Sequence, residues 1–395
     1  MSVSARFPNS SVEFELLCLI ARPKPDLPQA VQLLRAGINF PALIDLAEDH
    51  GVRPQLIGSL SALSWPHVPP PVRAELEGFQ RLHGARALAA AEELCRVATA
   101  LAEKGLCFAV FKGAVLAVAL YGDVSRREYV DIDILVPAEQ VDAAERLLEA
   151  LGYRAANGDR AFRHAFLGYL RQWAFVHAAT DTAIDLHWDF SGAHVPFPLS
   201  PADVWRDLDH VSIGGHSLPT VSGANLALLL AGHGTKEAWR CLGWVCDFAM
   251  LLDRSPDLDW LDIHSRAQAR GCGDAVLLAC AVARELLDAT VPQALLGPLD
   301  RNDRVGALAA RLTRHLREGL PEPDSEQNFS DFHLCESRLA KLGAWLRLAM
   351  TRTAGDYEAM KLPPALWSLY YVMRPFRLAA KVVASISLPS TSMKR

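Results

Sequence analysis

The chain has 395 residues, of which 51% are hydrophobic and 22% are charged, with a formal net charge of −5. This length exceeds one typical domain and can bury a substantial core, so the composition is that of a globular protein and excludes a disordered one. The acidic balance argues against broad nucleic-acid binding, which needs a basic surface, although local basic patches remain compatible with it.

The eight cysteines and the apolar segments indicate a reducing compartment. No Cys-x-x-Cys spacing occurs, so no zinc site is expected, and cysteines in apolar segments behave as small hydrophobic residues. We find no signal peptide and no apolar stretch long enough to cross a bilayer. We therefore expect a cytoplasmic protein without a transmembrane segment.

Residues 1–95 are predicted to form an N-terminal helical region. Apolar residues recur with a spacing near 3.6 in segments 12–21, 27–36 and 40–50, and an alanine-rich helix is expected over 73–101. Prolines between positions 66 and 71 interrupt the chain before that helix. This region holds no candidate catalytic cluster, so we expect it to pack against or cover the region that follows.

Residues 96–215 alternate between strand and helix patterns and are predicted to form an α/β domain. A strand over 106–111 leads into a short helix, and a helix over 138–151 ends at Gly152, which can supply its C-terminal cap. Two more strands, 173–179 and 182–188, flank a polar turn. This order predicts a small mixed sheet with helices packed on it.

Asp131 and Asp133 lie two residues apart in an otherwise apolar run that ends at Val136. Side chains of a strand alternate between its faces, so both carboxylates point the same way. Two like charges on a half-buried strand repel each other, and each resists burial unless it is paired. A divalent cation resolves that conflict, and hard oxygen ligands suit Mg²⁺ bound to a nucleoside triphosphate.

Asp185 is the candidate third carboxylate. On its strand, Ile184, Leu186 and Trp188 fall on one face and Asp185, His187 and Asp189 on the other. If this strand lies beside the strand of Asp131, Asp185 joins the first pair. Three carboxylates then predict a phosphoryl-transfer site with two Mg²⁺ ions that neutralise a triphosphate.

Lys112, Gly113 and Arg127 precede the acidic pair and are candidates for triphosphate binding. A glycine at a strand-to-helix turn lets phosphate oxygens approach backbone amides. Lys112 can neutralise phosphate charge, or it can be an ordinary surface lysine. Arg127 can hold a phosphate with two hydrogen bonds, or it can form a structural salt bridge with a neighbouring acid.

Three further residues are candidates for nucleotide binding. His187 shares the face of Asp185, where it either contacts the nucleotide or supports a metal ligand. His233 and Lys236 lie three residues apart at the end of a predicted helix, and together they could form the far wall of a nucleotide cleft. The alternative for this pair is a buried core histidine beside a solvated lysine.

Residues 216–395 are predicted to form a C-terminal helical domain, so the chain as a whole is expected to be predominantly helical. Helices are expected near 224–233, 238–252, 260–269, 274–287 and 303–317, and the polar, proline-containing segment 318–330 is expected to be a linker. Segment 366–388 mixes aromatic and basic residues. It could bind a protein partner or a membrane surface, or pack on the helical domain.

The motifs in this order resemble a known family. The combination of Lys112-Gly113, Arg127-x-x-x-Asp131-Ile-Asp133 and Ile184-Asp-Leu-His-Trp188, with His233 downstream, is similar to the uncharacterised bacterial nucleotidyltransferase family of the DNA polymerase beta superfamily. The superfamily usually begins its site with Gly-Ser or Gly-Gly, whereas this chain has Lys112-Gly113-Ala114. Family members often carry a second histidine four residues after the first, where this chain has Glu237.

The resemblance implies a Mg²⁺-dependent enzyme with ATP or another NTP as substrate. It implies that Asp131, Asp133 and Asp185 bind the metal and that an NMP group passes to a hydroxyl or phosphate acceptor, releasing pyrophosphate. The acceptor is expected to be a small molecule or a peptide, as in peptide or secondary-metabolite modification. The alternative, motivated by the altered Gly-Ser motif, is a catalytically inactive scaffold or antitoxin-like interaction protein.

Overall fold

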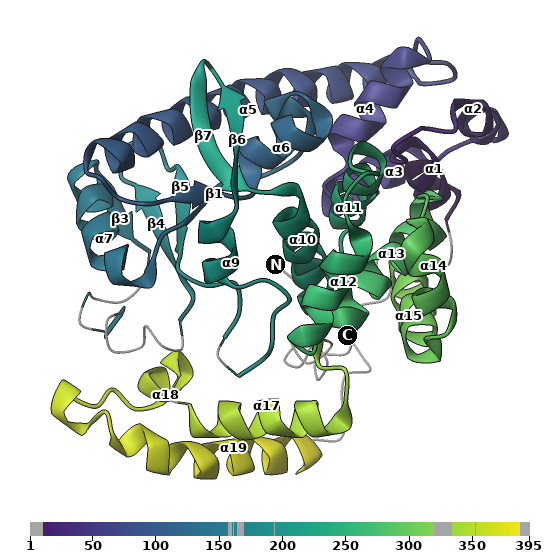
Figure 1. Ribbon diagram of the computed structural model, residues 1–395. Helices are drawn as coiled ribbons and strands as arrows, with labels where there is room; N and C mark the ends of the chain where they lie inside the picture. Colours follow the sequence, from purple (N-terminus) through teal and green to yellow (C-terminus); the bar gives the residue numbers. More distant parts are fainter. Residues whose placement is uncertain are drawn as a thin grey trace.

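The computed structural model describes residues 11–156, 160, 162–163, 170–192, 194–319, 334–351 and 353–387. Figure 1 shows a single twisted sheet on one side of the molecule and a body of packed helices on the other. Helices form most of the described elements, and the sheet is mixed. The predicted α/β core within a predominantly helical chain is therefore confirmed.

The N-terminal helices follow the expected apolar spacing. Side chains at three N-terminal caps accept hydrogen bonds from the first turn of their helices, and these caps fix where each helix begins. The fourth helix was not predicted, because it is buried on several sides and has no capping side chain. The bounds are α1 Val12–Ile20, α2 Leu27–Ala36, α3 Phe40–Asp49 and α4 Arg53–Ala62.

Helix α5, Pro70–Glu103, runs for 34 residues and connects two hydrophobic cores. Its start at Pro70 agrees with the predicted break, because proline lacks the amide hydrogen that the first helical turn leaves unpaired. Leu76 packs in the core of the helical body, whereas Ala87 and Leu101 pack in the core beneath the sheet. The predicted boundary at residue 95 falls inside this helix.

The sheet has seven strands in the order β3-β4-β5-β2-β1-β7-β6. The pairs β2–β5 and β1–β7 are parallel, and the others are antiparallel. The predicted hairpin between β4 and β5 is confirmed, with Asp181 in the left-handed region at φ 59° in its turn. The bounds are β1 Ala109–Val110, β2 Asp131–Leu135, β3 Tyr153–Ala155, β4 Gln172–His177, β5 Ala183–His187, β6 Leu208–Ile213 and β7 His216–Val221.

Short helices connect these strands. Gly152 follows the end of the helix Val141–Ala150 with φ 95°, as its predicted capping role requires. Strands β6 and β7 carry the sheet to Val221, past the predicted boundary at residue 215. The connecting helices are α6 Gly113–Tyr121, η1 Val124–Arg126, η2 Ala138–Gln140, α7 Val141–Ala150 and α9 Pro201–Arg206.

The helices that follow the sheet surround the central helix α13. Ser222 caps the first of them, as predicted. Ala238 and Trp239 have φ of 55° and 50°, so the next helix begins at Leu242 and not at the expected Ala238. The bounds are α10 Gly223–Lys236, α11 Leu242–Arg254, α12 Trp260–Ala269, α13 Gly273–Leu287, α14 Gln293–Asp300 and α15 Asp303–Glu318, of which α14 was not predicted.

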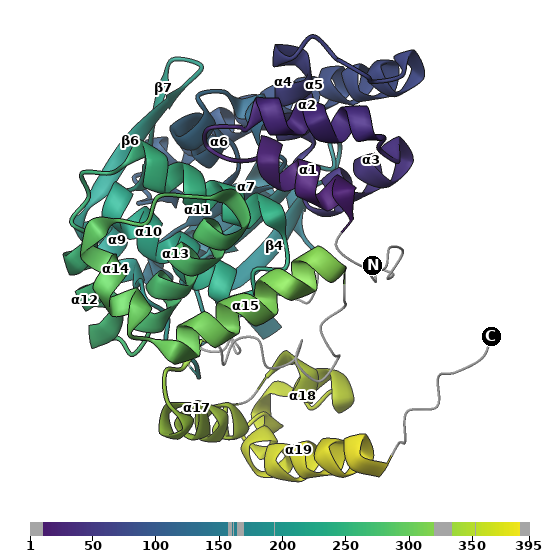
Figure 2. The ribbon, with the colours of Figure 1, turned by 90° about the vertical axis from the view of Figure 1, so that its right-hand side faces the viewer.

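The last helices lie together at one end of the molecule (Figures 1 and 2). They are α17 Arg338–Met350, α18 Ala354–Ala359, η4 Pro364–Leu366 and α19 Leu369–Ser387, and α19 corresponds to the expected helix over 366–388. Most of the expected linker 318–330 lies outside the described residues. Among the described helices, none combines the length and apolarity needed to cross a bilayer.

Candidate metal and nucleotide site

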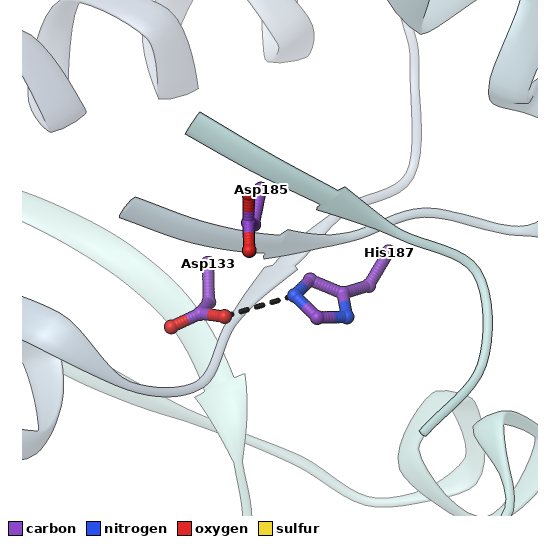
Figure 3. A group of neighbouring side chains, drawn as sticks. All are labelled: Asp133, Asp185 and His187. Atoms are coloured by element: carbon purple, nitrogen blue, oxygen red, sulfur yellow. Dashed lines mark hydrogen bonds and ion pairs between the residues drawn. The ribbon is translucent and has the colours of Figure 1, made fainter. Parts of the chain in front are cut away.

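The parallel pairing of β2 and β5 brings two of the predicted carboxylates together. Asp133 is directly opposite Asp185 in the register, so both side chains project from the same face of the sheet. Potential ligand atoms of Asp133, Asp185 and His187 all lie within 4.8 Å of one another. Figure 3 shows these three side chains converging from the two strands.

His187 is held in place by contacts on two sides. Its Nε2 atom lies 2.8 Å from Oδ1 of Asp133, and the ring packs edge-on against Phe111 at a centroid distance of 4.9 Å. Both partners are buried, so these contacts fix the ring while leaving one Asp133 oxygen outside the hydrogen bond. The position of His187 fits either of the two roles considered for it from the sequence.

Asp131 lies on the same strand, two residues before Asp133, but outside the group of three within 4.8 Å. Burial, together with the charges of Asp133 and Asp185, raises the pKa of Asp131 to about 6. The same two causes, burial and the charge of Asp133, raise the pKa of Asp185. These two carboxylates therefore resist ionisation as long as no cation balances them.

Asp133 has the opposite electrostatic environment. Burial alone would raise its pKa, but Lys112 and the hydrogen bond from His187 outweigh burial and hold the pKa below its usual range. The Nζ atom of Lys112 lies 3.6 Å from Oδ1 of Asp133. Lys112 is therefore directed toward the acidic cluster and is not an ordinary surface lysine.

Gly113 begins helix α6 with a backbone that an L-residue would strain. Its φ is 54°, and a Cβ atom there would lie 3.2 Å from the carbonyl oxygen of Asp131. Glycine thus lets the start of α6 approach the site strand closely. Phosphate binding by this turn remains a prediction.

Arg127 forms a buried ion pair. Its Nε atom donates to both carboxylate oxygens of Asp247, at 2.9 and 3.1 Å, and the Tyr121 hydroxyl donates to the same carboxylate at 2.9 Å. This pair joins the loop before β2 to α11 across 120 positions of sequence. Arg127 therefore forms the structural salt bridge that was considered as one of its two roles. Its contact with phosphate remains a prediction.

Helix α10 presents the other two predicted residues. His233 packs edge-on against Trp244 at 5.0 Å, and burial, reinforced by the charges of Lys112 and Lys236, holds its pKa well below the usual value. The imidazole is therefore neutral at neutral pH. Lys236 lies 3.9 Å from a carboxylate oxygen of Glu237. Nucleotide contact by His233 and Lys236 remains a prediction.

Gln172 belongs to the site and was missed in the sequence. Its side-chain amide donates to Oδ2 of Asp185 at 2.6 Å from the adjacent strand β4. The available signal was strand alternation: once β4 pairs with β5, Gln172 lies opposite His187 and faces the same side. The amide orients a carboxylate without neutralising it.

The donors of this cluster fit a divalent cation. Carboxylate oxygens from adjacent strands converge, and the His187 imidazole lies within reach of them. Burial and the charge of Asp133 raise the pKa values of Asp131 and Asp185. Among the described residues, this is the one such group of three or more.

The chain is similar to one protein family and to two solved structures. The model of a family described as "Uncharacterised nucleotidyltransferase" matches residues 36–288, which include every residue of the site. Two solved structures of ANT(2″)-Ia are similar at 17% identity: a crystal structure in complex with adenylyl-2″-tobramycin and a solution structure of this antibiotic-resistance factor. They cover 56% and 59% of this chain and 96% and 100% of theirs, with TM-scores of 0.26 and 0.27. No curated protein matches the chain.

Proposed function

The chain belongs to the family of uncharacterised nucleotidyltransferases, and from this premise we propose that it transfers an NMP group from an NTP to a hydroxyl or phosphate acceptor. Mg²⁺ is the proposed cofactor, held by Asp133 and Asp185 with Asp131 beside them. The proposed acceptor is a small molecule or a peptide. Bound at these carboxylates, the metal would neutralise triphosphate charge.

One observation carries the proposal: the register that sets Asp133 opposite Asp185, with ligand atoms within 4.8 Å of each other and of His187. Asp133 is buried and Asp185 is half-buried, so their two charges at this separation are costly unless a cation or proton balances them. Lys112 and the turn at Gly113 adjoin the same cluster, where a triphosphate would bring its negative charge.

The proposed reaction needs a nucleophile, a leaving group and a proton acceptor. The acceptor oxygen forms a bond to the α-phosphorus, the bond from that phosphorus to the bridging oxygen of the β-phosphate breaks, and pyrophosphate leaves. A hydroxyl acceptor gives up its proton in this step. Asp185 is the proposed base, because it is the half-buried carboxylate of the opposed pair and so can lie beside an attacking hydroxyl.

The test is Mg²⁺-dependent pyrophosphate release from each of the four NTPs, with cell extract as the source of acceptor. We expect Asp133→Asn to lower release by roughly a thousandfold. Asp189→Asn is the matched control. Asp189 is an acid two residues beyond the end of β5, and it pairs with Arg171 at 3.3 Å and not with the cluster. Undiminished release in Asp133→Asn would refute the proposed site.

A second candidate function is a nucleotidyltransferase fold that serves as an inactive scaffold or antitoxin-like protein. Its support is Ala114 at the position where the superfamily usually has a hydroxyl or glycine, together with Lys112, which already pairs with Asp133. Calorimetry with NTP and Mg²⁺ separates the two functions. Absence of nucleotide affinity in the intact protein favours the scaffold, whereas binding that Asp133→Asn weakens favours the enzyme.

A further inference from the structure

Helix α17 exposes an apolar stripe along its length. Leu339, Leu342, Leu346 and Met350 follow one another at intervals of three and four residues, so they share one face of the helix. Their exposed fractions are 81%, 54%, 51% and 62%. Ala344, on the opposite side, is fully buried. The apolar stripe is therefore the face that α17 turns away from the protein.

Helix α19 repeats this pattern. Leu369, Val372 and Phe376 share one face and are 44%, 62% and 73% exposed, while Tyr370 and Arg374 on the other side are buried. Helices α17 and α19 contact each other at the end of the molecule away from the body (Figure 2). We refer to the seven exposed residues of the two stripes as the C-terminal apolar face.

The two helices are held in this orientation by buried polar contacts. The guanidinium of Arg374 donates to the carbonyl of Leu348 at 2.7 Å, to the hydroxyl of Thr353 at 2.7 Å and to Asp356 at 2.8 Å. These bonds link α17, α18 and α19. Since a buried arginine must keep its partners, a rotation of either helix that buried its apolar stripe would have to break these bonds.

The charge of this part of the chain is opposite to that of the rest. Residues 338–395 contain ten Lys and Arg against two Asp and Glu, a formal charge of +8, whereas residues 1–337 contain 30 against 43, a formal charge of −13. One of the two acids, Asp356, is already paired with Arg374 and Arg377. The two acids of this segment therefore balance only a small part of its positive charge.

We propose that α17 and α19 dock the protein on the surface of an anionic lipid bilayer. Exposed Leu, Met and Phe on helices that also carry Lys and Arg are the combination that inserts into the headgroup region of such a surface. Pairing of this face with the same face of a second copy is less favourable, because two segments that each have a formal charge of +8 repel. The acidic body would face away from the lipid.

The experiment is flotation of the intact protein with vesicles, compared between phosphatidylcholine alone and phosphatidylcholine mixed with phosphatidylserine. We expect binding to the mixed vesicles that weakens as salt is added. Binding of equal strength to neutral vesicles overturns the proposal, as does absence of binding to both. A dimer in solution that Phe376→Ser dissociates, without vesicle binding, assigns the face to a second copy instead.

Separate variants on α17 and on α19 test the contribution of each helix to vesicle binding. We expect Val372→Ser/Phe376→Ser and, separately, Leu342→Ser/Leu346→Ser to lower vesicle affinity by roughly tenfold or more. The matched control is Leu82→Ser/Leu88→Ser on α5, where the two leucines are 53% and 64% exposed. Equal losses in the control and the test variants would also overturn the proposal.

Charge variants complete the test. Removing one positive charge with Lys341→Gln is expected to lower affinity for the anionic vesicles about fivefold, with no effect on neutral ones. Arg86→Gln, an exposed arginine of α5, is the control and should leave affinity unchanged. None of these variants alters the metal and nucleotide site, so nucleotidyl transfer reports separately on the proposed function.

Discussion

The β2–β5 site and the α17–α19 unit depart from ordinary globular packing in opposite directions. The site sets a buried carboxylate beside a half-buried one, whereas the C-terminal helices expose leucine, methionine and phenylalanine. Both arrangements cost free energy in the isolated chain, and a buried polar group or a large exposed apolar patch is more informative than an ordinary surface residue. Each departure supports one of the two proposals: a metal-bound nucleotide at the site and a lipid surface at the C-terminal helices.

The largest expected effect on stability concerns the buried ion pair of Arg127 and Asp247 beside the site. We expect Arg127→Met to lower the free energy of unfolding by about 3–5 kcal/mol, because it leaves the carboxylate of Asp247 buried with Tyr121 alone. Chemical denaturation measures the loss. The double variant Arg127→Met/Asp247→Leu should lose much less, and its NTP affinity then tests the predicted phosphate contact of Arg127 separately from stability.

A somewhat smaller effect should follow from pH. The pKa of Asp131 is raised to about 6 in the fold, so the folded state binds the proton more tightly than the unfolded chain. In a metal-free buffer, protonated Asp131 therefore stabilises the folded state, and this contribution is complete below its unfolded pKa near 4. It is lost as the pH rises through about 6, and the loss in the free energy of unfolding is at most about 3 kcal/mol.

Denaturation curves across that pH range measure the effect of Asp131, with Asp131→Asn as the comparison. The variant should lack this part of the pH dependence. Added Mg²⁺ should restore stability to the wild-type protein at neutral pH. A wild-type profile indistinguishable from that of Asp131→Asn would contradict the raised pKa.

Gly113→Ala probes the close approach of α6 to the site strand, with a smaller expected cost of about 1–2 kcal/mol. The new methyl group would meet the Asp131 carbonyl at 3.2 Å in a left-handed backbone. Gly122→Ala is the matched control, since Gly122 has φ 81° and no neighbouring heavy atom within 4 Å of an added Cβ. Thermal unfolding should show a greater loss for Gly113→Ala than for the control.

The smallest effect is expected on the exposed side of the comparison. Phe376→Ser should change the free energy of unfolding by no more than about 0.5 kcal/mol, because the ring is 73% exposed and contributes little burial. Thermal unfolding of the variant measures it. A loss of several kcal/mol would mean that the phenyl ring is packed in solution and that the C-terminal apolar face is not open.

Much of the site's framework was predictable from local patterns. Alternation along the chain predicted that Asp185 and Ile184 would face opposite sides of a strand, and Ile184 is buried in the sheet core while Asp185 faces Asp133. The pairing of β2 with β5 required an assumption about neighbours, which the structure confirms. Period-two patterns identify a face, but they carry no information about which strand lies beside it.

The features that were missed depend on contacts between distant segments. The partner of Arg127 lies 120 residues away, and Gln172 reaches Asp185 only after β4 and β5 have paired.

Helix α14 was missed for a local reason, because it contains Pro298, which lowers the local helical propensity. Ala238 and Trp239 adopt the left-handed backbone conformation, which these residue types rarely do. The sequence therefore did not predict that the chain breaks between α10 and α11.

Helix α5 has a practical consequence for dissecting the protein. At about 1.5 Å per residue it extends roughly 50 Å, and it belongs to both hydrophobic cores. A recombinant fragment that starts at residue 96 would cut through the helix and strip Ala87, Ala91 and Leu94 from beneath the sheet. This continuous helix also resists bending between the two hydrophobic cores.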